Sequence, residues 1–233
     1  MSKKSILIAG AGIGGLTAAL CLHQRGFDVT LVERARQLMP LGVGINLLPH
    51  AVRELDGLGL GADLAATSVA PSVIAFFDNR GNEVFREARG IEGGYDYPQL
   101  SVHRGQLQML LLDAVAERIG SDALRKGSGL TGFEQNSDTV VADTKAGRIG
   151  ADALVGADGI NSAVRAALHP DGDPLLWSGI QMFRGALREK PFLDGRTMAI
   201  VKGDNGIDLV VYPIGGGMVN WVIQRTDAAR SPR

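Results

Sequence analysis

The chain begins with short apolar runs and polar breaks in the order strand, helix, strand. Residues 5–9 and 27–32 are strand-length apolar runs, and residues 16–25 between them have the length and composition of a helix. Run length separates the two kinds of element, because buried strands are short and helices need about ten or more residues. The order predicts a βαβ unit over residues 5–34.

The middle of the chain carries a helical period. Residues 104–119 place apolar side chains at the three- and four-residue spacing of an amphipathic helix. That apolar face consists of Leu107, Leu110, Leu111, Ala114 and Val115. A glycine- and proline-broken segment, residues 40–50, is a poor helix or central strand, so a loop is predicted there, with a helix near residues 51–58.

Strand patterns surround this helix. Residues 73–77 and 83–86 flank a polar turn and predict a hairpin. A meander is predicted over residues 130–134, 139–144 and 148–150, and a buried strand over 153–157. Longer strands then follow at 179–187, 197–202, 207–212 and 219–224. The pattern predicts a nucleotide-binding domain over residues 1–173 and the start of a mostly antiparallel second domain over 174–233.

Glycines at the first strand–helix junction predict a dinucleotide site. Gly10 allows a tight turn, Gly12 removes a Cβ that would block a pyrophosphate, and Gly15 lets the helix pack close to the strand. Glu33 ends the second strand, where a carboxylate can bind ribose hydroxyls and would repel a 2′-phosphate. An adenine dinucleotide is expected, NADP is disfavoured, and FAD and NAD both remain open.

Composition removes several other classes of protein. The formal net charge is −1, so nothing predicts a nucleic acid or an anionic membrane as partner. Cys21 is the single cysteine, which excludes an internal disulfide, and the four histidines show no metal-site spacing. The apolar run at residues 6–9 is too short for a signal peptide or a membrane span, so a cytoplasmic protein is expected.

Three separated motifs together resemble a known family. They are the glycine motif with Glu33, Arg104 at the start of the amphipathic helix, and the Asp158-Gly159 segment within residues 156–165. The combination resembles the FAD-dependent aromatic hydroxylases of the para-hydroxybenzoate and salicylate hydroxylase type. It is most similar to the phenazine-carboxylate hydroxylases, with further likeness at residues 41–46, 103–105, 193–195, 212–214 and 219–222.

The resemblance implies a fold, a cofactor and a site. The fold is α/β, a Rossmann-like FAD-binding domain with an antiparallel-sheet substrate domain that is incomplete at the C-terminus, because family members continue for well over a hundred residues. The implied FAD contacts are Gly10, Gly12, Ile13, Gly14, Gly15, Glu33, Arg34, Gly42, Val43, Gly44, Arg104, Leu130, Asp158, Gly159 and Arg165. Ser162 is expected mainly to cap a helix.

The implied activity is hydroxylation of a small aromatic substrate. NAD(P)H would be the co-substrate that reduces FAD, and dioxygen would supply the inserted oxygen atom. No metal is implied, and Arg184, Tyr212 and Pro213 are the candidate substrate-side residues. Two alternatives stay open: a flavoprotein oxidoreductase that does not hydroxylate, and a catalytically inactive FAD-binding remnant. A homo-oligomer that buries the incomplete sheet is also expected.

Overall fold

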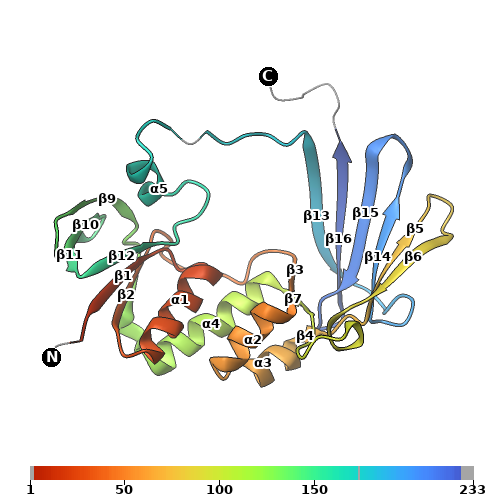
Figure 1. Ribbon diagram of the computed structural model, residues 1–233, viewed down its shortest axis with the longest axis horizontal. Coiled ribbons are helices and arrows are strands. Elements are labelled where there is room, and N and C mark those ends of the chain that lie inside the picture. Colours follow the sequence, from red (N-terminus) through yellow and green to blue (C-terminus); the bar gives the residue numbers. More distant parts are fainter. Residues whose placement is uncertain (1–2, 173, 227–233) are drawn as a thin grey trace. The chain divides into compact units, whose positions relative to one another are not determined.

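The computed structural model describes residues 3–172 and 174–226, and the chain divides into two compact units (Figure 1). Unit 1 comprises Met1–Pro40 and Leu107–Pro174, and unit 2 comprises Leu41–Gln106 and Leu175–Arg233. Each unit therefore contains two stretches of chain, and each has its own sheets.

Unit 1 is built on a parallel sheet. Its strands lie in the order β12 (Ala153–Gly156), β1 (Ser5–Ala9), β2 (Asp28–Glu33) and β8 (Leu124–Lys126), with every neighbouring pair parallel. Helix α1 (Ile13–Gln24) joins β1 to β2, so the predicted βαβ unit is confirmed. Helix α4 (Arg104–Arg118) follows the predicted apolar period, and Leu107 and Leu111 on it are fully buried.

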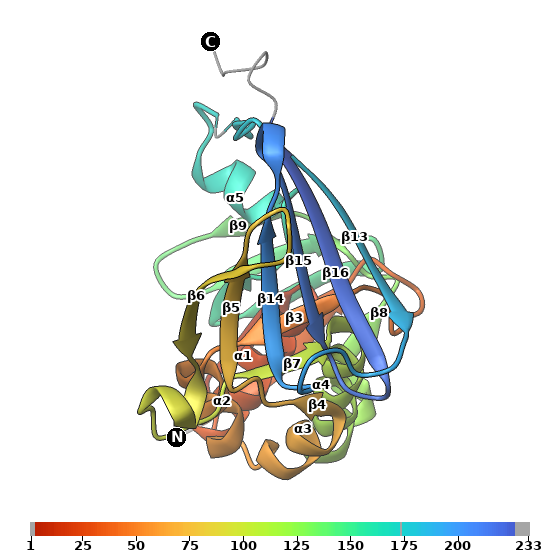
Figure 2. The same cartoon turned by 90° about the vertical axis from the view of Figure 1, so that its right-hand side faces the viewer.

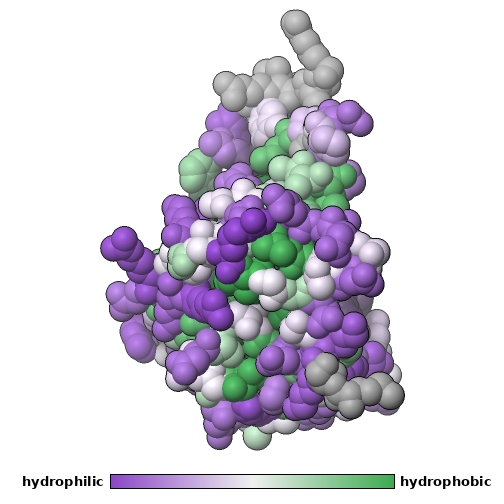
Figure 3. Space-filling model, turned by 90° about the vertical axis from the view of Figure 1, so that its left-hand side faces the viewer, coloured by the Kyte–Doolittle hydropathy of each residue, from purple (hydrophilic) through white to green (hydrophobic). Residues whose placement is uncertain are grey.

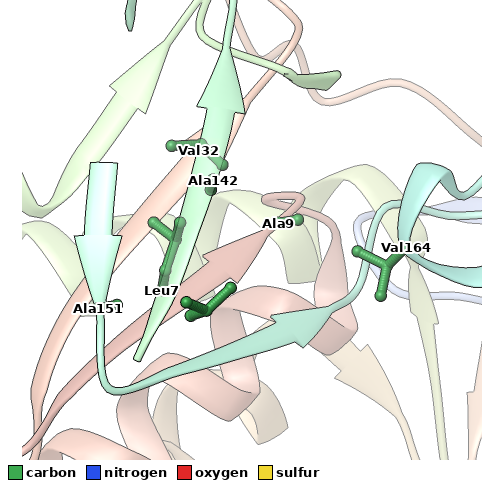
Figure 4. Close-up of a cluster of buried hydrophobic side chains, with 7 residues drawn as sticks. Leu7, Ala9, Val32, Ala142, Ala151 and Val164 are labelled. Carbon is green, nitrogen blue, oxygen red and sulfur yellow. The ribbon is translucent and has the colours of Figure 1, made fainter. Parts of the chain in front are cut away.

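A three-stranded antiparallel sheet lies against the parallel one in unit 1. It consists of β9 (Leu130–Gln135), β10 (Val140–Thr144) and β11 (Gly147–Ala151), the predicted meander. Figure 4 shows the apolar cluster between these elements, to which helix α5 (Ala163–Leu168) adds Val164. The labelled members of this cluster are Leu7, Ala9, Val32, Ala142, Ala151 and Val164. A short 3-10 turn, η2 (Ser121–Ala123), leads into β8.

One expectation in unit 1 was wrong. Strand β12 exists where it was expected, but its side chains are half-buried or exposed. The physical reason is its place at the edge of the sheet, where β1 is its only neighbouring strand.

Unit 2 contains a six-stranded sheet (Figure 2). Its strand order is β13 (Ile180–Arg188), β16 (Met218–Thr226), β15 (Ile207–Pro213), β14 (Thr197–Lys202), β5 (Val73–Phe77) and β6 (Glu83–Ala88). All neighbours are antiparallel except β14 and β5. The predicted hairpin and the predicted long strands are therefore confirmed, and they belong to one sheet. The turn η3 (Asp204–Gly206) joins β14 to β15.

A smaller sheet in unit 2 corrects a second expectation. Segment Gly44–Leu47, predicted as part of a loop, is strand β3, which pairs with β7 (Leu100–His103), which in turn pairs with β4 (Ser68–Val69). Gly44 is tolerated because β3 is an edge strand of this sheet, and the prolines lie outside the strand. Two helices follow, α2 (Pro49–Gly57) and α3 (Gly61–Thr67), and the turn η1 (Gly90–Gly93) precedes β7.

The division of the chain differs from a split into residues 1–173 and 174–233. One junction between the units falls between Pro174 and Leu175, and residues 41–106 also fall in unit 2. Pairing explains this, because β5 pairs with β14 and so joins the strands that follow residue 175. The functional division into a FAD-binding and a substrate domain stays a prediction.

The surface is mixed. On the face drawn in Figure 3, polar side chains surround a smaller apolar area. No helix within the described residues is long and apolar enough to cross a membrane. Edge strand β13 in unit 2 exposes large apolar side chains, which are Ile180, Met182, Phe183 and Leu187.

Candidate cofactor and substrate sites

Two of the motif glycines are required by the protein's own packing. Gly10 has a φ of +103°, in the region that favours glycine, and a Cβ on it would collide with the carbonyl oxygen of Ala157. A Cβ on Gly15 would collide with the carbonyl oxygen of Gly10. These contacts agree with the roles expected of Gly10 in the turn and of Gly15 in helix–strand packing.

The other two glycines face empty space. A Cβ added to Gly12 or to Gly14 would meet no protein atom within 4 Å. Gly12 is the N-cap of α1, and no side chain caps this helix end. The first-turn N–H groups of Gly14 and its neighbour Ile13 thus belong to an uncapped helix N-terminus with open space in front of it. Such a terminus binds phosphate groups, so this cradle fits the diphosphate of FAD.

Glu33 holds the glycine turn from the side. Its Oε2 accepts a hydrogen bond from the Ala11 amide at 2.9 Å, and its Oε1 accepts one from the Ala35 amide at 2.8 Å. A carboxylate oxygen can accept more than one hydrogen bond, so both oxygens retain capacity for ribose hydroxyls. The sequence predicted a ligand contact here and did not predict these two structural bonds.

Gln108 holds the same turn from another element. Its Nε2 donates to the carbonyl oxygen of Ala11 at 2.9 Å, and its side chain is buried. Sequence reasoning missed this residue. The only available signal was a glutamine one turn after Arg104, beside the apolar face of α4.

The Asp158-Gly159 segment lies against the glycine turn. Strands β1 and β12 run parallel, and the Ala157 amide donates to the Ala9 carbonyl at 2.8 Å, so both chains leave the sheet at the same edge. Gly10 packs on Ala157 and Asp158, and Gly159 has a φ of +82° with open space at its Cβ position. Open α/β sheets bind ligands at this carboxyl edge.

The side chain of Asp158 has a structural partner. Its Oδ2 accepts from the Ala163 amide at 2.7 Å, and its Oδ1 accepts from the Ser162 hydroxyl. Ser162 in turn caps α5 by accepting from the Arg165 amide at 2.9 Å, which confirms the predicted cap. The Arg165 guanidinium donates to the Ile160 carbonyl. These bonds fix the loop that follows β12 and leave its backbone facing the glycine turn.

Arg34 and Leu130 occupy the neighbouring strand ends. The Ser128 amide donates to the Glu33 carbonyl at 2.8 Å, and a Cβ on Gly129 would lie 2.6 Å from the Arg34 Cβ. The Leu130 side chain packs against the apolar cluster of unit 1. The approach of Gly129 therefore sets the position of the Arg34 backbone beside Glu33.

In unit 2, the structure brings Gly42, Val43 and Arg104 together. The Arg104 amide donates to the Val43 carbonyl at 2.9 Å. Gly42 has a φ of +132°, and its Cβ position lies 3.4 Å from the Arg104 Cβ. The Arg104 side chain is exposed, which leaves its guanidinium accessible to a ligand.

Asn220 is a buried residue that sequence reasoning missed. Its Oδ1 accepts from the Gly44 amide at 2.7 Å, and a Cβ on Gly44 would lie 2.8 Å from Asn220 atoms and from Ile214. Its Nδ2 is buried and has no hydrogen-bond partner within the described residues. Asn220 is 176 residues from Gly44 in the sequence, so no local pattern predicts the pair.

Tyr212 lies in a polar network on the large sheet. Burial raises the pKa of the Tyr212 phenol, while the charge of Arg184 and a hydrogen bond from Asn46 act against that rise. The Asn46 Oδ1 accepts from the Ser101 hydroxyl at 2.6 Å. Pro213, next to Tyr212, is buried, whereas the Arg184 side chain is exposed. Arg184 and Tyr212 thus lie within electrostatic range of each other, and their substrate-side role stays a prediction.

The chain matches the family model described as "FAD binding domain" over residues 3–175. It therefore belongs to the FAD-binding domain family, whose cofactor is FAD. No metal-binding group of three or more His, Cys, Asp or Glu side chains occurs in the described parts of the chain.

Two of the relatives are hydroxylases of aromatic acids by name. The chain is 44% identical to phenazine 1,6-dicarboxylic acid hydroxylase PhzS of Lysobacter antibioticus, over 98% of this chain and 60% of that protein. It is 33% identical to 3-hydroxybenzoate 6-hydroxylase 1 of Aquipseudomonas alcaligenes, over 98% of this chain and 59% of the relative.

Solved structures agree in fold. The structure of Klebsiella pneumoniae HpxO complexed with FAD and uric acid has a TM-score of 0.83 and 25% identity, and the match covers 99% of this chain and 58% of that one. The chain spans about 60% of the length of the curated relatives it matches. The α/β fold with a parallel sheet and antiparallel sheets is thus the fold of FAD-dependent hydroxylases.

Proposed function

We propose that this chain is the FAD-binding portion, with part of the substrate sheet, of an NAD(P)H-dependent monooxygenase that hydroxylates a small aromatic compound. The observation that carries the proposal is the open space at Gly12 and Gly14 in front of an uncapped helix, beside the Asp158-Gly159 loop. The likeness to hydroxylases that act on phenazine dicarboxylate and hydroxybenzoate supports the reaction class.

Each unit carries its own candidate FAD contacts. In unit 1, the N–H groups of Gly12, Ile13, Gly14 and Gly15 would bind the diphosphate, with Glu33 at the ribose, and with Arg34, Leu130, Asp158, Gly159 and Arg165 as further contacts. In unit 2, Gly42, Val43 and Gly44 would contact the flavin through backbone groups. Arg104 would bind a phosphate, for which its fork of donors is suited. Bound FAD, reduced by NAD(P)H, would supply the oxygen-activating chemistry.

This chain's own residues would position the substrate and donate a hydrogen bond to it. Arg184 would attract a substrate carboxylate, because its guanidinium is exposed and has no acidic partner within the described residues. Burial keeps the Tyr212 phenol protonated, so it would donate a hydrogen bond to the substrate. Pro213, buried beside it, would help to keep water away.

Flavin absorption tests this proposal without needing turnover. The FAD-loaded chain should change its flavin bands when an aromatic carboxylate such as 3-hydroxybenzoate is added, and Arg184→Gln should abolish the change. Arg80→Gln is the control, since Arg80 lies in the β5–β6 turn. Flavin bands that shift equally in Arg184→Gln would show that the substrate assignment is wrong.

The alternatives predict different results. A non-hydroxylating flavoprotein oxidoreductase would bind FAD and react with NAD(P)H, but its flavin bands would not change when an aromatic acid is added. A catalytically inactive remnant would bind FAD and respond to neither. We further propose a cytoplasmic location and self-association through the exposed apolar strand β13.

A further inference from the structure

A cavity of about 290 Å³ lies within unit 2, and none of its lining residues is among those assigned to FAD. Its walls come from the start of helix α2 and from the segment that leads into β7. The lining residues are Leu48, Pro49, His50, Arg53, Arg89, Gly90, Tyr95, Asp96, Tyr97 and Gln99. Its volume is just below the range for drug-sized ligand sites, about 300–1,000 Å³, so only a small ligand would fit.

Gln99 is the observation that points to a ligand. Its side chain is 4% exposed and lines the cavity, yet it makes no side-chain hydrogen bond within the described residues. Its amide atoms are open to the cavity, so a group inside the cavity can hydrogen-bond to them. A ligand in the cavity with a hydrogen-bonding atom would supply the missing partner.

The charge of the cavity favours an anion. Arg53 and Arg89 both line it, and Asp96 is the one lining carboxylate, so the lining carries a net positive charge with histidine neutral. Arg53 contacts Glu54 at 2.8 Å in an exposed pair, and the half-buried Arg89 contacts Glu87 at 3.2 Å. Exposed pairs contribute little, and a guanidinium has donors left for a second anion.

The helix end adds to this preference. Helix α2 begins at Pro49, and its N-cap residue Leu48 supplies no capping side chain. Both residues line the cavity, together with His50 of the first turn. The positive end of the helix dipole therefore faces the same space as the two arginines.

The walls are built rather than accidental. Gly90 has a φ of +57°, and a Cβ on it would lie 2.6 Å from the backbone nitrogen of Gln99. The segment therefore folds back closely on itself. The Tyr95 amide donates to the Gly90 carbonyl at 3.1 Å. Glu92 forms an exposed ion pair with Arg196, just before β14, at 2.7 Å. Tyr95 and Tyr97 thus line the cavity from a segment held by its own backbone contacts.

We propose that this cavity binds a small aromatic carboxylate at a site separate in residues from Arg184 and Tyr212. The carboxylate would contact Arg53 of α2 and Arg89, which precedes η1. The ring would lie against Tyr95 and Tyr97, and Gln99 would hydrogen-bond to a ring substituent.

Salicylate is the probe, titrated into the FAD-free chain by calorimetry. Gln99→Leu and Arg89→Gln should each weaken salicylate binding about tenfold or more, because each removes a buried or charged hydrogen bond. Arg53→Gln should also weaken binding. Because Arg53 is exposed, this variant should fold even if the other two do not. Arg80→Gln, outside both proposed sites, should leave the dissociation constant within about twofold.

Three results would overturn the proposal. Salicylate could fail to bind the folded, FAD-free chain, or bind with equal affinity in all three cavity variants. Binding that is lost in Arg184→Gln alone would place the ligand on the large sheet instead. Equal affinity for benzyl alcohol, which lacks the charge, would also contradict it. None of these results depends on whether FAD binds, so the proposed function is tested separately.

Discussion

Gly12 and Gly15 stand three residues apart in one turn but are required for different reasons. Gly15→Ala should destabilise the FAD-free chain by about 1–3 kcal/mol, because its new Cβ collides with the Gly10 carbonyl. Gly12→Ala should leave the FAD-free stability nearly unchanged, since its Cβ meets no protein atom. Urea unfolding of both variants measures this difference, and equal stabilities would contradict the assignment.

Glu33 should matter for both stability and cofactor binding. Glu33→Ala removes a charged acceptor from the Ala11 and Ala35 amides, which costs roughly 1–3 kcal/mol, and it removes the proposed ribose partner. FAD titration and urea unfolding should both register the loss. Glu54→Ala is the control, because Glu54 is exposed and pairs only with Arg53 in the described structure. Unchanged FAD affinity in Glu33→Ala would reduce Glu33 to a structural residue.

At this scale the sequence predicted the residues whose spacing is local. The roles of Gly10 and Gly15 followed from one turn, and Ser162 followed from the pattern of a helix start. The bonds of Gln108 and Asn220 join segments far apart in the chain, so no periodicity could show them.

At the scale of elements, Asp152 links the start of β1 to the turn between β11 and β12. Hydrogen bonds from the Ser5 amide, from Lys4 and from the Ser5 hydroxyl lower the pKa of Asp152 to about 2, from 3.8. A lowered pKa means that its stabilising effect is fully present above pH 3.8 and is lost as the pH falls toward 2. Asp152→Asn should therefore make the melting temperature depend less on pH between these two values. An unchanged acid profile would contradict this.

The elements themselves were predicted where periodicity and turn signals agree. Helix α4, the hairpin of β5 and β6, and the meander β9–β11 follow their patterns closely. Strand β3 was not predicted, because Gly44 at its start and Pro49 beyond its end are typical of a loop. Its stability comes from pairing with β7, outside its own segment. The edge position of β12 could not be predicted either, since burial depends on which strands cover it.

At the scale of the whole molecule, strand β13 exposes apolar side chains on both faces. Met182 and Phe183 are each 53% exposed and, as neighbours in a strand, point to opposite sides. Such a surface favours association, so the chain should form oligomers that grow with concentration in light scattering. Phe183→Lys should shift the mass toward the monomer. A wild-type chain that stays monomeric at high concentration would contradict this prediction.

The isolated chain should show negligible NAD(P)H oxidation that depends on an aromatic substrate. The relatives it matches are longer by about two fifths of their length, and catalysis needs the reacting groups closely held. Oxygen uptake with FAD, NAD(P)H and 3-hydroxybenzoate measures this. Turnover at an ordinary enzymatic rate would show that the described portion is sufficient for hydroxylation.

The most direct measurement is equilibrium titration of the FAD-free chain with FAD, followed by flavin fluorescence, in the wild type and in Gly12→Val. The account predicts saturable binding of one FAD per wild-type chain. It also predicts loss of that binding in Gly12→Val without loss of folding, because the new side chain would fill the open space before α1. Stoichiometric FAD binding by folded Gly12→Val would contradict the cradle, and with it the proposed function.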